Sequence, residues 1–94
     1  MEITVRYFTI LRKLTEKKQE KLNIKVGSTL EDMLALLIKR YGESFERYVS
    51  SGKAKKGVQM VFLLNGKDIA QFDGLKTTLH NGDTITLMPP IAGG

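Results

Sequence analysis

The 94-residue sequence contains no cysteine and no tryptophan, and it has a single histidine and two prolines. Without cysteine there is no disulfide framework, no thiolate metal site and no thiol nucleophile. His80 lies in a polar His-Asn-Gly-Asp stretch that is typical of a solvated turn, and the aspartates fall in different predicted elements. We therefore expect no metal site, no bound cofactor and no catalytic residues of the usual kinds.

Long apolar runs are also missing. No run approaches the roughly 20 residues that cross a bilayer, and the start, Met1–Arg6, lacks the basic-then-apolar order of a signal peptide. A chain of this length supports one hydrophobic core rather than two. We expect a cytoplasmic protein with no membrane partner, one domain over residues 1–88 and a flexible tail over residues 89–94.

Positive charge is concentrated in one segment. The chain has 15 Lys and Arg against 10 Asp and Glu, and residues 6–25 contain seven basic residues beside Glu16 and Glu20: Arg6, Arg12, Lys13, Lys17, Lys18, Lys21 and Lys25. Such a stretch can meet phosphates, so a small RNA-binding module is an alternative reading. Exposed aromatics interleaved with the basic residues are lacking, which favours a solvated edge or a docking surface for an acidic partner instead.

The pattern of apolar residues predicts a small α+β sheet with one main helix. Alternation and turn signals predict strands over residues 2–10, 20–26, 58–64, 67–70 and 84–88, with a turn or one helical turn over 11–18 and a helical turn near 45–49. Ser28-Thr29-Leu30-Glu31 matches a capping box, in which Ser28 and Glu31 cap the helix start, and Gly42 is a natural stop. The helical stripe between them comprises Leu30, Met33, Leu34, Leu37, Ile38 and Tyr41.

Strict alternation assigns a role to each face of the sheet. The helix-covered face should hold Ile3, Val5, Tyr7, Leu22, Ile24, Val26, Met60, Phe62, Leu64, Ile85 and Leu87. The opposite face then carries Arg6 and an apolar group: Phe8, Val61, Leu63 and Met88. Apolar side chains on an uncovered face, ringed by polar groups, are typical of a protein interface. The alternative is that central strands of small domains are often apolar on both faces.

The chain ends in Pro89, Pro90, Ile91, Ala92, Gly93 and Gly94. Because glycine has no Cβ, such an ending can thread a narrow channel, and the two prolines stiffen the approach and end the preceding strand. The terminal carboxylate becomes an electrophile once it is converted to an anhydride. The alternative is an ordinary disordered terminus.

Several segments in one order carry a family resemblance. They are Val5-Arg6-Tyr7-Phe8, Gly27-Ser28-Thr29-Leu30, Leu63-Leu64-Asn65-Gly66, Leu79-His80-Asn81-Gly82-Asp83, and Leu87-Met88-Pro89-Pro90 with the final Gly-Gly. Together they resemble the small subunit of molybdopterin synthase and its relatives among the ubiquitin-like sulfur carriers. The resemblance implies a β-grasp fold, with a mixed sheet and one main helix packed across one face.

The resemblance also implies a function. An E1-like adenylating enzyme consumes ATP to activate the carboxylate of Gly94, and sulfur then displaces AMP to leave a thiocarboxylate. The tail enters the large subunit of molybdopterin synthase, with which the carrier can form a heterotetramer, and the thiocarboxylate gives its sulfur to the pterin that binds molybdenum or tungsten. Phe8, Leu63 and Met88 lie where the family presents apolar residues to partners. Relatives with the same tail serve thiamine synthesis, tRNA thiolation or lysine conjugation.

Overall fold

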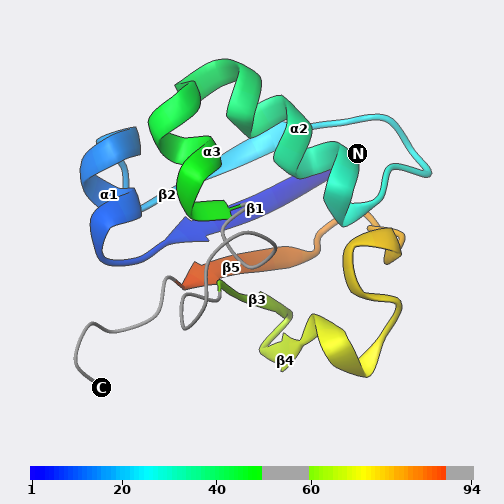
Figure 1. Ribbon diagram of the computed structural model, residues 1–94. Coiled ribbons are helices and arrows are strands. Elements are labelled where there is room, and N and C mark those ends of the chain that lie inside the picture. The colour runs from blue at the N-terminus through cyan, green and yellow to red at the C-terminus, as the bar shows by residue number, and fades with distance from the viewer. Residues whose placement is uncertain (50–59, 89–94) are drawn as a thin grey trace.

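A computed structural model describes residues 1–49 and 60–88 of the chain. Five strands form one mixed sheet in the order β2-β1-β5-β3-β4 (Figure 1). The central pair, β1 (Glu2–Tyr7) and β5 (Thr84–Met88), is parallel. The outer strands β2 (Gln19–Asn23), β3 (Val61–Leu64) and β4 (Lys67–Asp68) pair with their neighbours in the antiparallel sense. The expected α+β class and mixed sheet are confirmed.

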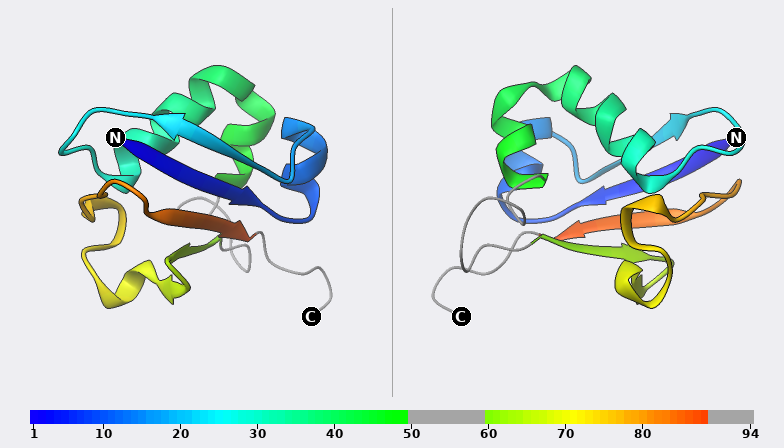
Figure 2. Two further views of the ribbon diagram at one scale, coloured as in Figure 1. Left: turned by 180° about the vertical axis from the view of Figure 1, so that it is seen from behind. Right: turned by 45° about the vertical axis from the view of Figure 1, so that its right-hand side comes forward.

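The main helix lies across one face of this sheet. Helix α2 (Leu30–Tyr41) is followed directly by α3 (Glu43–Val49), and both lie on the same side of the strands (Figure 2). A short helix, α1 (Ile10–Thr15), joins β1 to β2, and two 3-10 turns, η2 (Ile69–Gln71) and η3 (Gly74–Lys76), lead from β4 toward β5. Gly42 separates α2 from α3 as expected.

All buried apolar side chains of the described residues form one cluster between the sheet and these helices. Along β1 the predicted alternation is seen directly, since Ile3, Val5 and Tyr7 are fully buried and Arg6 is exposed. Ile85 and Leu87 of β5 are equally buried. From the main helix, Leu30, Met33, Leu34 and Leu37 are buried in the same cluster. The assignment of the covered face is therefore confirmed for the two central strands.

The start of α2 is one residue later than the sequence suggested. Thr29, not Ser28, is the cap, since its hydroxyl accepts a hydrogen bond from the Asp32 amide at 3.2 Å, and the Asp32 carboxylate accepts one from the Thr29 amide at 2.9 Å. The backbone groups of Ser28 already have partners. Its amide donates to the carbonyl of Lys25, and its carbonyl accepts from the amide of Leu79. The expected Ser28–Glu31 capping box is therefore wrong, although the motif type is right.

Strand ends are the other corrections. β1 stops at Tyr7 rather than residue 10, because Thr9 takes a positive φ of 53° and turns the chain into α1. β2 ends at Asn23, and Val26, expected in the core, is 86% exposed because it lies in the loop that turns at Gly27. β4 ends at Asp68, whose carboxylate caps η2 by accepting from the Ala70 amide at 2.8 Å.

Candidate functional site

The face of the sheet opposite the helices brings the predicted interface residues together. In the register, Val61 lies beside Met88, and Leu63 lies beside Thr86. On the other side of β5, Thr86 is paired with Arg6. Thr86 lies between Arg6 and Leu63 in the register and is only 8% exposed. We call this surface the open face and define it by Arg6, Phe8, Val61, Leu63 and Met88.

Phe8 lies at the end of the open face where β1 and β5 finish. It directly follows Tyr7, the last residue of β1, which is paired with Leu87 of β5. The guanidinium groups of Arg6 and Arg12 lie 5.2 and 4.8 Å from the centre of its ring. Arg12 is held there by a 2.9 Å hydrogen bond from its Nε to the carbonyl of Tyr7. At exposed positions such a cation on an aromatic ring contributes on the order of 0.5–1 kcal/mol. Phe8 and the two arginines therefore form a preformed basic and aromatic site.

The predicted site residues thus divide into two groups. Arg6 and Val61 are exposed, and Phe8, Leu63 and Met88 are half-buried, all on one surface. The tail residues Pro89, Pro90, Ile91, Ala92, Gly93 and Gly94 lie outside the described residues. The last described residue, Met88, belongs to the open face, so by chain connectivity the tail begins at that surface. Arg12 was missing from the predicted interface.

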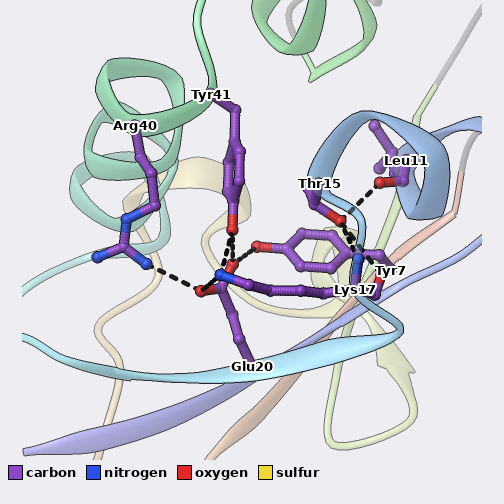
Figure 3. A network of polar contacts seen from close by, with 7 residues as sticks. All are labelled: Tyr7, Leu11, Thr15, Lys17, Glu20, Arg40 and Tyr41. Carbon is purple, nitrogen blue, oxygen red and sulfur yellow. Dashed lines mark hydrogen bonds and ion pairs between the residues drawn. The ribbon is translucent and has the colours of Figure 1, made fainter.

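A charged cluster on the covered face was also missed (Figure 3). Glu20 of β2 is paired with Val5 and points toward the helices, and its side chain is only 9% exposed. Its carboxylate accepts hydrogen bonds from the hydroxyls of Tyr7 and Tyr41. Arg40 contacts it at 2.8 Å and Lys17 at 3.2 Å, and Lys17 also donates to the Tyr41 hydroxyl at 3.0 Å. We call these five residues the Glu20 cluster.

The cluster favours the ionised carboxylate of Glu20 and the neutral hydroxyl of Tyr7. Burial opposes ionisation of Glu20, but the hydroxyls of Tyr41 and Tyr7 and the ammonium of Lys17 outweigh it and lower the pKa of the carboxyl. Burial, helped by the bond to Glu20, raises the pKa of Tyr7 well above its ordinary value. The bonds to Tyr41 and Glu20 raise the pKa of Lys17. The contacts of Glu20 with Arg40 and Tyr41 tie β2 to the end of α2.

The sequence did contain a signal for this cluster. Strict alternation that puts Leu22 and Ile24 on the covered face also puts Glu20 there. A carboxylate at an inward position requires partners, because an unpaired buried charge is very costly. Tyr7 and Tyr41, both assigned to the core, each bring a hydroxyl that needs a partner of its own when buried.

Comparisons with known proteins identify sequences to which this chain is similar. The sequence profile described as the ThiS family matches residues 5–94. Small archaeal modifier protein 3 of Haloferax volcanii is 31% identical over 94 residues, which is all of both chains. Sulfur carrier protein CysO of Mycobacterium tuberculosis is 33% identical over 97 residues, again covering both chains completely.

A solved structure extends the likeness to three dimensions. A chain of the Amycolatopsis orientalis BexX/CysO complex superposes with a TM-score of 0.71, is 28% identical, and is matched over 98% of this chain and 99% of that one. The solved structures that resemble this chain are ubiquitin-like β-grasp proteins. The predicted β-grasp fold is therefore confirmed. In the part of the chain that the structure describes, no helix is long and apolar enough to cross a membrane.

Proposed function

We propose that this chain, which belongs to the ThiS family, carries sulfur as a thiocarboxylate formed on Gly94. The family comprises ubiquitin-like sulfur carriers and modifiers. The observation that carries the proposal is the extent of the match. The ThiS profile runs through residue 94 and so includes the Pro-Pro-Ile-Ala-Gly-Gly ending, where the proposed chemistry takes place.

The proposed chemistry needs no catalytic side chain from the carrier. A carboxylate oxygen of Gly94 attacks the α-phosphorus of ATP in the active site of an E1-like enzyme, and pyrophosphate leaves. A sulfur nucleophile then adds to the acyl carbon, and AMP leaves with the bonding electron pair. Gly93 and Gly94 have no Cβ, which suits them to a narrow channel, and Pro89 and Pro90 restrict the tail that reaches it. An activation that consumes ATP supports the predicted cytoplasmic location.

The open face is the proposed docking surface for these partners. Its apolar members Phe8, Val61, Leu63 and Met88 form a centre, and the guanidinium groups of Arg6 and Arg12 stand at one side. An apolar centre with a charged rim is the usual anatomy of a protein interface. Because the tail follows Met88, a partner that covers this face receives the tail at its border.

For the acceptor, the sequence resemblance supports the large subunit of molybdopterin synthase, in a heterotetramer with two carriers. Neither of the two relatives reported above is named for molybdopterin. The molybdopterin role therefore stays a prediction, and it is tested by the pterin product itself.

A second candidate is covalent attachment to lysines of other proteins. It is favoured by the match to a protein named as a small archaeal modifier, which is 31% identical over its whole length. The same adenylate serves both roles, because a lysine amine can displace AMP as sulfur does. The two candidates differ only in the nucleophile that attacks the activated Gly94.

The test is the intact mass of the protein after incubation with ATP, a sulfur source and the adenylating enzyme of its own cell. We expect a mass gain equal to replacement of one oxygen by sulfur, and no gain in a variant that lacks Gly94. An unchanged mass with a demonstrably active enzyme would refute the carrier role. RNA affinity that is sensitive to salt and survives loss of Gly94 would point to the nucleic-acid alternative.

The acceptor is then assigned with the thiocarboxylated protein. Addition of a molybdopterin synthase large subunit and the pterin precursor should return the original carboxylate mass and produce a dithiolene. Conjugates of higher mass, formed in cell extract only when Gly94 is present, would assign the modifier role instead.

A further inference from the structure

A groove runs along the outer side of β2, away from the open face. It has a volume of about 340 Å³ and lies between β2 and α2. Its buried apolar lining is Leu22 and Ile24 of the β2 segment and Leu37 of α2, and Leu36, which is 49% exposed, adds an apolar wall. An apolar hollow between a strand and a helix can receive side chains of one further chain segment.

The backbone beside the groove is free to pair. β2 is the last strand of the sheet on this side, and no strand among the described residues lies beyond it. Its ladder with β1 uses alternate residues, as the bonds of Lys18 to Tyr7 and of Ile24 to Met1 show. The amides and carbonyls of Gln19, Lys21 and Asn23 therefore point outward. Lys21 and Asn23 also line the groove, so the free backbone and the apolar hollow belong to one site.

Within residues 1–49 and 60–88, the other edge of the sheet offers no comparable site. β4 has two residues, and the chain turns at once into η2. Short edge strands are a common way to prevent pairing with another chain. The five residues of β2 leave an edge long enough for an added strand.

The charge around the groove indicates which kind of chain segment can bind there. Lys21 and Arg40 are among its described lining residues, their side chains are mostly exposed, and none of those lining residues is acidic. Because Lys21 alternates with Leu22, its side chain stands on the other face of the strand from the apolar lining. Arg40 is held in place by Glu20 at 2.8 Å, and Lys21 has only Glu2 nearby, at 3.9 Å. A second copy of the chain would bring the same two cations against them. An acidic segment would neutralise them.

We propose that the outer edge of β2 binds an extended segment of a partner protein that alternates apolar and acidic residues, adding it to the sheet as a further strand. Successive side chains of a strand point to opposite faces. The apolar row then enters the groove between Ile24 and Leu36, and the acidic row faces the side of Lys21. The groove shares no residue with the open face, so this partner can bind while an enzyme holds the tail. The proposal does not depend on the chemistry of Gly94.

The probe is a blocked seven-residue peptide that alternates isoleucine and glutamate. It is titrated into the full chain, with amide signals followed by NMR. We expect the largest shifts in β2 and the facing side of α2, with little change at Phe8 and Leu63. In amide hydrogen exchange, the outward amides of Lys21 and Asn23 should exchange at least about tenfold more slowly with bound peptide, because they gain ladder bonds. Deleting Gly94 should leave the affinity unchanged.

Matched controls separate strand addition from general attraction. Lys21→Glu should weaken binding at least about tenfold, whereas Lys39→Glu, the same charge change at an exposed α2 position that does not line the groove, should have a much smaller effect. Leu36→Glu should also weaken binding. A peptide methylated on alternate backbone nitrogens keeps its side chains and should not bind, because it cannot complete the ladder.

Three results would overturn the proposal. One is equal affinity for the methylated and unmodified peptides. Another is equal weakening by Lys21→Glu and Lys39→Glu, which would mean that only net charge matters. The third is an absence of β2 shifts at millimolar peptide, or shifts centred on the open face.

Discussion

Tyr7 and Phe8 are neighbours in the sequence but stand on opposite faces of the sheet. Tyr7 is fully buried, and its ring centre lies 6.2 Å from those of Tyr41 and Phe45 in edge-on contacts. Its hydroxyl donates a hydrogen bond to Glu20. Phe8 is half-buried, and its ring is contacted by two guanidinium groups. The covered face has thus satisfied its polar and apolar groups within the chain, whereas the open face retains groups that a partner can still engage.

The difference shows how a small domain separates stability from recognition. Every buried apolar residue that the structure describes belongs to the core on the covered face, so stability depends mainly on that side. The open face is ordered by the same strands yet carries little of the core. Substitutions on the two faces should therefore have different consequences even at adjacent positions.

The largest effect is expected from the pair Leu87 and Met88 in β5. Leu87 is fully buried on the covered face, and Leu87→Ala should lower the free energy of unfolding by about 2–5 kcal/mol, because it leaves a cavity. Met88→Ala on the open face should cost about 1 kcal/mol. Urea denaturation of both variants measures the difference. Equal losses would mean that the faces are not distinct in stability.

A smaller effect is expected in the Glu20 cluster. Glu20→Gln should lower the free energy of unfolding by about 1.5–3 kcal/mol at neutral pH, because several hydrogen bonds to a charged group are weakened. The same charge change at exposed Glu16 should have little effect. Both variants are compared with the unmodified chain by denaturation.

The loss in Glu20→Gln should depend on pH in a defined direction. Folding lowers the pKa of Glu20, so its ionised form stabilises the fold above the ordinary value of 4.5, and this is lost as the pH falls through the lowered value. The gap between the Glu20→Gln variant and the unmodified chain should be constant above that range and shrink below it. A gap that widens in acid would contradict the lowered pKa.

The smallest effect on stability is expected from Leu63→Asp on the open face, where the free energy of unfolding should change by about 1 kcal/mol or less. Binding to the adenylating enzyme should weaken at least about tenfold, because a charge enters the apolar centre of the interface. Val26→Asp introduces the same charge at an 86% exposed position and should leave binding unchanged. Unfolding of the Leu63 variant would mean that the residue belongs to the core.

Much of the fold was predictable because local signals agreed with one another. Alternation along β1 identified the buried face, Asn65-Gly66 identified the β3–β4 turn, and Gly42 marked the end of α2. Strand ends were less predictable, since Thr9 and Asp68 turn the chain through backbone and capping geometry that alternation does not contain. The interface residues followed from alternation as well, but Arg12 did not, because alternation does not contain the turn at Thr9 that brings the first turn of α1 back toward Phe8.

The sequence by itself determined the α+β class, the covered face and the Gly-Gly ending, because period-two patterns, turn residues and terminal residues are local properties of a chain. Only the tertiary structure decided which distant charges meet. Residues 17, 20, 40 and 41 come together because β2 packs under the end of α2, and the groove exists because β2 is the last strand on its side. Contacts between elements depend on how whole faces pack, and no short stretch of sequence contains that information.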